Sequence, residues 1–158
     1  MTYGTIMDDH TKWMRIALQE AEKALKKQEV PVGAVVINEG EIIGAGHNLV
    51  ETLHDPTAHA EMLAISAASR SLISWRLNDS ILYTTLEPCS MCIGAILLAR
   101  IPTVVFGAND PRYGACGSVL QIAQNDYLDI RVEVVSGVLE QECSGIIKDF
   151  FAKIRQQK

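Results

Sequence analysis

The sequence predicts an α/β fold that forms a single domain over residues 1–158. Short apolar runs rich in β-branched residues alternate along the chain with longer segments of helical periodicity, a pattern typical of strands and helices that share one sheet. The length and a hydrophobic content of 48% are enough to bury one substantial core. No internal repeat or low-complexity linker divides the chain, so we expect no second domain.

The N-terminal part of the chain predicts a helix followed by a hairpin. The helix is expected over about residues 9–28, entered from the capping candidates Asp8 and Asp9. Strand-like runs follow at 33–38 and 41–46, and Glu39-Gly40 between them is suited to a hairpin turn. The apolar stripe of the helix consists of Met14, Ala17, Leu18, Ala21 and Leu25.

The rest of the chain continues the alternation of helices and strands. Pro111 and two glycines mark 109–117 as a surface loop, a kind of segment that often carries functional residues. The remaining expected elements are a loop over 48–57, a helix over 58–70, a strand over 81–86, a helix that opens at Cys89, a strand over 103–107, a strand over 130–135 and a helix from about residue 140.

Two cysteines occupy the predicted start of a helix. Cys89 and Cys92 stand three apart between an apolar strand and a helix-like run, so they share one face of a first helical turn. The unpaired amides and positive dipole of such a turn favour the thiolate forms, which are the forms that bind metals. Pro88 has no N–H and therefore suits a helix start.

His59 completes a donor set that zinc favours. Two thiolates and an imidazole are common zinc ligands, and three protein ligands leave the fourth tetrahedral position for water. Such an open position is typical of catalytic zinc rather than structural zinc. The residues His59, Cys89 and Cys92 therefore predict a zinc-dependent hydrolase.

Glu61 is expected to carry protons beside the metal. It stands two residues after His59, a spacing that does not place both side chains on one helical face as in an H-E-x-x-H site. Two thiolates cancel the formal charge of zinc, so the bound water is acidified less and a nearby base is needed. Glu61 would take the water's proton and pass it to the leaving group of the substrate.

Two other interpretations of the cysteine pair remain open at this point. A C-x-x-C that follows a strand and opens a helix is also typical of a thioredoxin-like redox site, although that leaves His59 and Glu61 without a role. A structural zinc site would take a fourth ligand from the remaining cysteines and nearby histidines. Those residues are Cys116, Cys143, His47 and His54.

His-Ala-Glu followed by Pro-Cys-x-x-Cys resembles the signature of the zinc-dependent, cytidine deaminase-like superfamily, whose members deaminate nucleobases. Further segments resemble bacterial tRNA-specific adenosine deaminases, and the likeness runs from about Trp13 to Phe151. These segments are Asn48, 55–61, 85–89, Arg100-Ile101, 104–108 and Gly117-Ser118.

The resemblance implies a fold and an activity. The fold would be the three-layer cytidine deaminase-like fold, a mixed five-stranded sheet flanked by helices. The activity would be hydrolytic deamination of the wobble adenosine to inosine in the anticodon loop of tRNA, with one zinc ion per subunit of a homodimer. Zinc-activated water would attack the base, and Glu61 would shuttle the protons.

The resemblance also implies substrate contacts, each of which has a simpler alternative. Asn48 would hydrogen-bond the flipped base, but it could be only a turn residue. Asp110 would lie by the RNA backbone, but it could only begin an Asp-Pro turn. Phe151 would meet the anticodon stem-loop, but it could belong to the core. The implied substrate-binding residues are Asn48, Ala60, Pro31, Pro88, Asp110, Phe151 and Lys153.

The charge distribution is unusual for a nucleic-acid enzyme. The 14 basic and 19 acidic residues give a formal net charge of −5, which does not attract phosphates globally. Residues 141–158 contain four basic and two acidic side chains, so this segment carries +2 and the remainder −7. The positive charge available for RNA is concentrated at the C-terminus.

The sequence also bears on location. Residues 1–10 lack the features of a signal peptide, and no apolar stretch approaches the roughly 20 residues of a membrane span. Four cysteines, two of them in a metal motif, do not form a secreted disulfide pattern. We expect a soluble cytoplasmic protein in which Cys116 and Cys143 are free thiols.

Two further functions remain open from the sequence. The zinc motif is shared by deaminases of free bases and nucleotides such as guanine, cytosine and deoxycytidylate. A non-catalytic zinc protein that binds RNA is the third hypothesis, although a structural site has no need of Glu61. Assays on free bases and on RNA would distinguish these functions.

Overall fold

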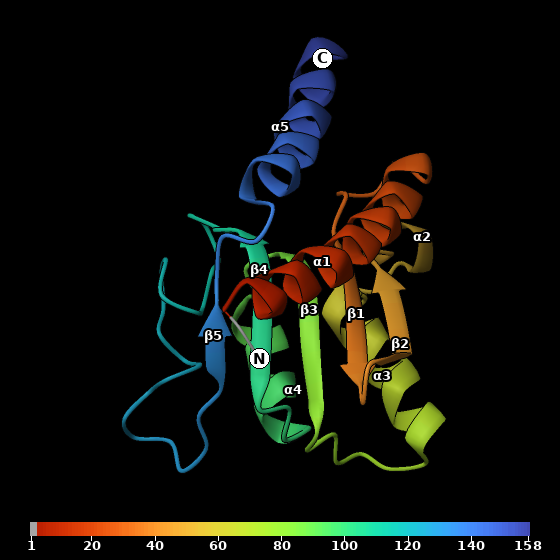
Figure 1. Ribbon diagram of the computed structural model, residues 1–158. Helices are drawn as coiled ribbons and strands as arrows, with labels where there is room; N and C mark the ends of the chain where they lie inside the picture. Colours follow the sequence, from red (N-terminus) through yellow and green to blue (C-terminus); the bar gives the residue numbers. More distant parts are fainter. Residues whose placement is uncertain (1–2) are drawn as a thin grey trace.

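The computed structural model describes residues 3–158 as a five-stranded sheet with helices on both faces (Figure 1). The strand order is β2-β1-β3-β4-β5, in which β1 is antiparallel to both neighbours and β3, β4 and β5 are parallel. The mixed sheet confirms the predicted fold class. The elements are α1 (Tyr3–Lys26), β1 (Gly33–Asn38), β2 (Glu41–His47), α2 (Val50–Leu53), α3 (Ala60–Leu72), β3 (Ser80–Leu86), α4 (Ser90–Leu98), β4 (Thr103–Ala108), β5 (Glu133–Val135) and α5 (Glu140–Gln156).

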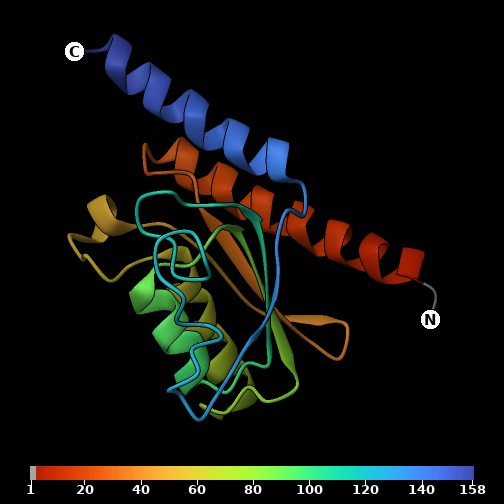
Figure 2. The same cartoon turned by 90° about the vertical axis from the view of Figure 1, so that its left-hand side faces the viewer.

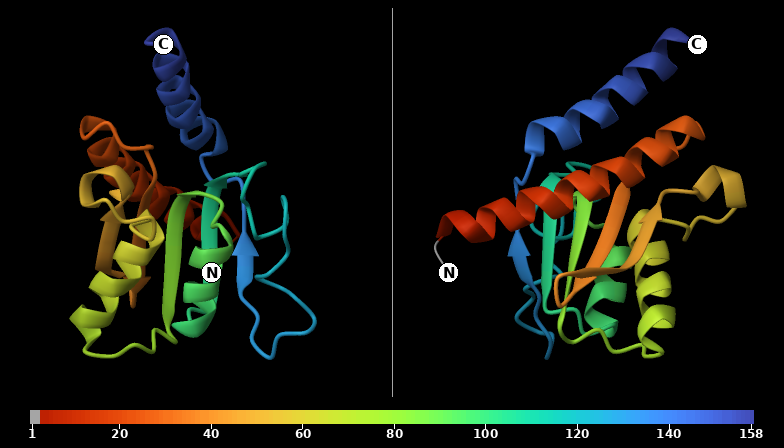
Figure 3. Two further views of the ribbon diagram at one scale, coloured as in Figure 1. Left: turned by 180° about the vertical axis from the view of Figure 1, so that it is seen from behind. Right: turned by 45° about the vertical axis from the view of Figure 1, so that its right-hand side comes forward.

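The helices and the sheet form three layers. Figure 2 shows α1 and α5 on one side of the sheet and α3 and α4 on the other, and Figure 3 shows the same arrangement from two further directions. One apolar core lies between the sheet and α3 and α4, and a second lies between the sheet and α1. The C-terminal part of α5 extends beyond the sheet (Figure 1). None of the described helices is long and apolar enough to cross a membrane.

The predicted hairpin is confirmed, and its turn has a clear conformational basis. Glu39 and Gly40 both adopt positive φ, 49° and 76°, as a two-residue type I′ turn requires. This turn matches the right-handed twist of the flanking strands, so Asn38 pairs directly with Glu41.

Three elements differ from the sequence prediction. The first helix starts at Tyr3, so Asp8 and Asp9 lie inside it and are not caps, because no proline interrupts the preceding residues. The short helix α2 forms inside the predicted loop 48–57. The last strand begins at Glu133 rather than at residue 130, because its pairing starts opposite Thr103, the first residue of β4.

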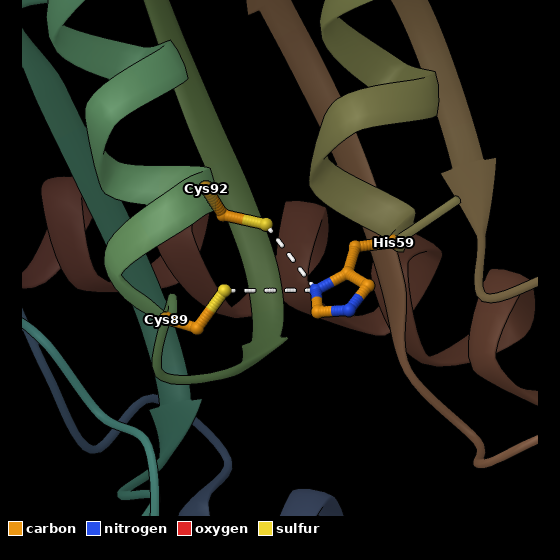
Figure 4. Close-up of side chains that lie close together, drawn as sticks. All are labelled: His59, Cys89 and Cys92. Carbon is orange, nitrogen blue, oxygen red and sulfur yellow. Dashed lines mark hydrogen bonds between the residues drawn. The ribbon is translucent and has the colours of Figure 1, made fainter. Parts of the chain in front are cut away.

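The parallel part of the sheet determines where a ligand can bind. β3 and β4 end at the same edge of the sheet, and ligands of α/β proteins bind outside the carboxyl ends of such strands. The helix α4 starts just after β3, and the start of α3 lies beside it (Figure 4). Two helix N-termini therefore meet at this edge.

Two glycines allow α3 to lie close against the edge strand β2. A Cβ atom at Gly44 would stand 2.3 Å from the carbonyl oxygen of Ala64, and one at Gly46 would stand 2.6 Å from that of Ala60. Both contacts are with helix backbone, which cannot turn aside as a side chain can. Because Gly44 and Gly46 have no side chain, α3 can pack directly against β2, and this contact fixes the position of the first turn of α3.

The mutation Gly46→Ala is expected to lower the free energy of unfolding by about 1–3 kcal/mol, because the added methyl group overpacks the contact with α3. Chemical denaturation would measure the change. Gly145→Ala is the matched control, since a Cβ there meets nothing within 4 Å and lies inside α5, where alanine favours the helix. Equal stability of the two variants would contradict this account of the β2–α3 contact.

Candidate metal centre and substrate pocket

Three side chains converge where α3 and α4 begin. His59 is the N-cap residue of α3 and Cys89 is the N-cap residue of α4, while Cys92 lies in the first turn of α4. The Nδ1 atom of His59 is 3.6 Å from Sγ of Cys89 and 3.5 Å from Sγ of Cys92, and both sulfurs face the ring (Figure 4). The expectation that both motif segments open helices is confirmed.

The spacing of the three atoms fits a tetrahedral metal ion. The donor atoms lie within 4.8 Å of one another. A tetrahedral zinc ion with ordinary bond lengths separates an imidazole nitrogen from a thiolate sulfur by about 3.5 Å. The two nitrogen–sulfur distances agree with this value, so the cluster is preformed for a metal of this kind.

The protonation of the cluster suits cation binding. A hydrogen bond from Cys92 lowers the pKa of Cys89 to about 4, with a further lowering by His59. The same bond, together with burial, raises the pKa of Cys92. The pair therefore holds a thiolate at neutral pH even without a metal.

Glu61 lies in the first turn of α3 beside this cluster. Its side chain is 4% exposed, and burial raises its pKa to about 7 despite the opposing effect of His59. A carboxyl group with a pKa near neutral can both accept and return a proton, which is the property of an effective general acid–base. The geometry therefore gives Glu61 a position and a pKa suited to proton transfer.

A cavity of about 930 Å³ opens from the cluster toward α5. His59, Glu61 and Cys89 lie at one end of its wall, and the carboxyl ends of β3 and β4 contribute another part. The helix α5 contributes Ser144, Ile147, Lys148, Phe151 and Arg155. The volume is at the upper end of the range for small-molecule pockets, so it exceeds the needs of a single base.

The structure places four of the predicted substrate-binding residues in the cavity wall. They are Asn48, Ala60, Asp110 and Phe151. Pro31 and Pro88 are buried and are not among the described lining residues, whereas the neighbours of Pro31, Val30 and Val32, are. Lys153 lies outside the lining, which instead includes Lys148 and Arg155.

The structure bears on the simpler alternatives for Asp110, a turn role, and for Phe151, a place in the core. Oδ1 of Asp110 accepts hydrogen bonds from the amides of Arg112 (2.9 Å) and Tyr113 (3.2 Å), so this residue does close a turn. Phe150 is buried, whereas Phe151 lines the cavity and is 37% exposed. The two rings pack edge to face against each other. Phe150 therefore belongs to the buried interior, and Phe151 belongs to the wall of the cavity.

Sequence reasoning missed several residues of the wall. Lys148 and Arg155 belong to the predicted basic tail, but only Lys153 is among the predicted substrate-binding residues. Lys148 and Arg155 flank Phe151 at helical spacing, so periodicity counted from Phe151 places them on the same face of the helix. Glu29 and Glu87 are buried carboxylates whose partners are distant in sequence, which no local pattern reveals. Arg112 and Tyr113 belong to the predicted loop, but no local signal singles them out.

The remaining cysteines and histidines do not add a fourth protein ligand. Among the described residues, only His59, Cys89 and Cys92 form a cluster suited to a metal. Cys116 and Cys143 are free thiols, as predicted. The ring of His47 contacts Glu20 and Lys27 instead. This arrangement favours an open metal site over a structural one.

The fold and the site together define a deaminase of the cytidine deaminase-like class. The family model of the MafB19-like deaminases matches residues 8–155. The tRNA-specific adenosine deaminase of Bacillus subtilis is 49% identical over 146 residues, which cover 92% of this chain and 91% of that protein.

Solved structures point to the same family. A structure from studies of A-to-I editing by tRNA:A34 deaminases at the wobble position of transfer RNA has a TM-score of 0.83 and 40% identity, and covers 86% of this chain and 99% of its own. A guanine deaminase from Bacillus subtilis is also 40% identical, but its TM-score is 0.59, with 69% of this chain and 66% of that chain covered. The chain belongs to the MafB19-like deaminases and, among them, to the tRNA-specific adenosine deaminases.

Cys89→Ala is expected to lose bound metal, because it removes one of three donors from the cluster. Elemental analysis of the purified variant should show far less than one metal ion per chain. Cys116→Ala is the control, since this thiol lies outside the cluster, and it should retain the metal. Undiminished metal in Cys89→Ala would exclude Cys89 as a ligand.

Proposed function

We propose that this protein deaminates the wobble adenosine in a tRNA anticodon loop to inosine, with one zinc ion per subunit of a cytoplasmic homodimer. Membership of the tRNA-specific adenosine deaminases supports the activity. The observation that carries the proposal is the extent of the cavity, which runs from Glu61 at its buried end to Lys148 and Arg155 on α5. The base of a nucleic acid would lie near Glu61, and its phosphate backbone would lie near Lys148 and Arg155.

His59, Cys89 and Cys92 would hold the zinc ion. Bound zinc would act as a Lewis acid that activates water for attack on C6 of adenine. The set of one imidazole and two thiolates supports zinc, and the donor distances described above agree with a tetrahedral ion that has these ligands.

Glu61 would transfer protons in the reaction. Its carboxylate would take the two protons of the attacking water in turn and deliver one to N1 and the other to the departing amino group, which leaves as ammonia. Burial favours the protonated form and raises its pKa to about 7, which suits a group that must both accept and return a proton.

Asn48 and Phe151 would orient the base and its neighbours. The side chain of Asn48 donates to the carbonyl of Val30 (3.3 Å) and accepts from the amide of Val50 (3.4 Å). An asparagine amide has a second N–H and a second lone pair, which remain for the edge of a base. The exposed ring of Phe151 offers a stacking surface for a base outside the duplex.

Deamination of free guanine is the alternative that the comparisons also raise, because a guanine deaminase is 40% identical to the chain. A free base carries no phosphate and therefore needs no cations in the wall of the cavity. Lys148 and Arg155 therefore favour a substrate that carries phosphates.

The direct test is inosine formation by the zinc-loaded protein on an anticodon stem-loop with adenosine at the wobble position. An otherwise identical stem-loop with cytidine, and free guanine, are assayed in parallel. Inosine from the adenosine stem-loop alone is expected. Release of ammonia from guanine alone would replace this proposal with the free-base activity.

Glu61→Gln is expected to retain zinc and to lower kcat on the adenosine stem-loop by about 10²–10⁴-fold, because the amide cannot transfer protons. Single-turnover kinetics and elemental analysis of the same preparation would measure both quantities. A kcat within tenfold of the wild-type value would remove Glu61 from the proton path.

Arg155→Ala is expected to weaken binding of the stem-loop and to reduce the slope of log K against log salt concentration by about one, since one phosphate contact is lost. Lys153→Ala should cause a smaller loss, because Lys153 does not line the cavity. Titrations at several salt concentrations would measure both slopes. A larger effect at Lys153 would place the RNA on the other side of α5.

A further inference from the structure

Glu87 is a buried carboxylate to which the mechanism above gives no role. It follows the last residue of β3 and precedes Pro88 and the metal ligand Cys89. Its side chain is 2% exposed, and no lysine or arginine among the described residues forms an ion pair with it. A buried charge requires close hydrogen-bond donors, so the identity of those donors indicates what Glu87 does.

All of its side-chain partners lie on one loop. Oε1 of Glu87 accepts from the amide of Asp110 (3.3 Å), and Oε2 accepts from the amides of Cys116 (3.1 Å) and Ser118 (3.2 Å). The hydroxyl of Ser118 also donates to Oε1. The carboxylate of Glu87 thus accepts hydrogen bonds from both ends of the loop 109–118.

Backbone contacts bring the same loop against the same residues. The amide of Ala115 donates to the carbonyl of Pro88 (2.9 Å), and the amide of Glu87 donates to the carbonyl of Ala108 (2.8 Å). A Cβ atom at Gly114 would meet the carboxylate of Glu87 and would stand 2.6 Å from the backbone carbonyl oxygen of Asp110, which cannot move aside, so this approach requires glycine. The loop is shaped around the carboxylate.

The loop forms the wall of the cavity that faces the substrate. Asp110, Arg112 and Tyr113 all line it, and Tyr113 is 63% exposed. This loop contains no helix or paired strand beyond the single bridge between Cys116 and Gln121, and its internal hydrogen bonds form only local turns, such as the one closed by Asp110. The bonds to Glu87 and Pro88 are what attach it to the start of α4. Glu87 therefore connects the helix that carries two metal ligands to the wall that meets the substrate.

We propose that Glu87 is a positioning residue that holds loop 109–118 against the metal-bearing end of α4, so that the substrate wall is formed before RNA binds. A preformed wall binds RNA without the cost of ordering the loop. The identity of the substrate in this inference rests on the proposed function, whereas the ordering of the loop does not.

The test compares Glu87→Gln with the wild-type, zinc-loaded protein. The amide keeps the shape of the side chain but replaces one acceptor with a donor, which then faces the N–H donors of the loop. We expect KM for the adenosine stem-loop to rise about tenfold, with kcat within threefold and one zinc ion retained per chain. Hydrogen exchange should accelerate in residues 109–118 and remain unchanged in α4.

Two further variants make the result specific. Glu133→Gln removes the same charge from an exposed position on β5 and should change neither KM nor exchange. Ser118→Ala removes one of the four donors, so a smaller rise in KM of about threefold is expected. If Glu87→Gln does not fold, an unchanged KM and unchanged loop exchange in Ser118→Ala overturn the proposal.

Other outcomes are equally decisive. Wild-type KM and wild-type exchange in Glu87→Gln would exclude the positioning role, as would loss of zinc with unchanged loop exchange. Failure of the wild-type protein to form inosine would overturn the proposed function alone. The exchange comparison would still decide whether Glu87 orders the loop.

Discussion

The parallel pairing of β3 with β4 determines where the functional side chains lie. The helix α4 connects these two strands, so it must start at the edge of the sheet where β3 ends and where β4 ends in turn. The start of α3 reaches the same edge because Gly44 and Gly46 let it lie against β2. Cys89 and His59 are the N-cap residues of α4 and α3. A metal cluster from segments thirty residues apart in the sequence follows from this geometry.

The same edge explains the electrostatics of the site. The amides at a helix N-terminus favour negative charge, and here two such termini surround two thiols and a carboxyl group. Burial acts in the opposite direction on Glu61, because its neighbours exclude water. The site therefore combines a thiolate, which a cation requires, with a carboxyl group that titrates near neutral pH.

Much of the fold and the centre of the site could be predicted from the sequence. The strands over 33–38 and 81–86 and the starts of α3 and α4 show clear periodicity and turn residues, and these local signals agree with the structure. The cluster suited to a metal was predictable, because histidine and paired cysteines at helix starts are residue types that commonly bind metals. His59, Cys89 and Cys92 need only be placed at helix starts to converge.

The periphery of the site could not be predicted in the same way. The helix α2 depends on Glu29, which accepts hydrogen bonds from Thr52, more than twenty residues away in the sequence. Which face of α5 meets the cavity depends on how the helix is docked, so the basic residues of the tail were recognised while Lys153 was chosen over Lys148 and Arg155. Such choices are made by tertiary contacts, which leave no local pattern.

The sparse burial of α5 has a consequence for how the protein releases what it binds. Only Cys143 and Phe150 of this helix are buried. The other walls of the cavity belong to the sheet, to the starts of α3 and α4, to loops bonded to them, and to the short helix α2, which Glu29 holds by hydrogen bonds. Elements with few buried contacts open at lower free energy than the core, as native-state hydrogen exchange detects. Undocking of α5 is therefore expected to be a local unfolding step that needs less free energy than opening of the sheet or of α3. Such a step would remove the cationic side of the pocket while the metal cluster stays assembled.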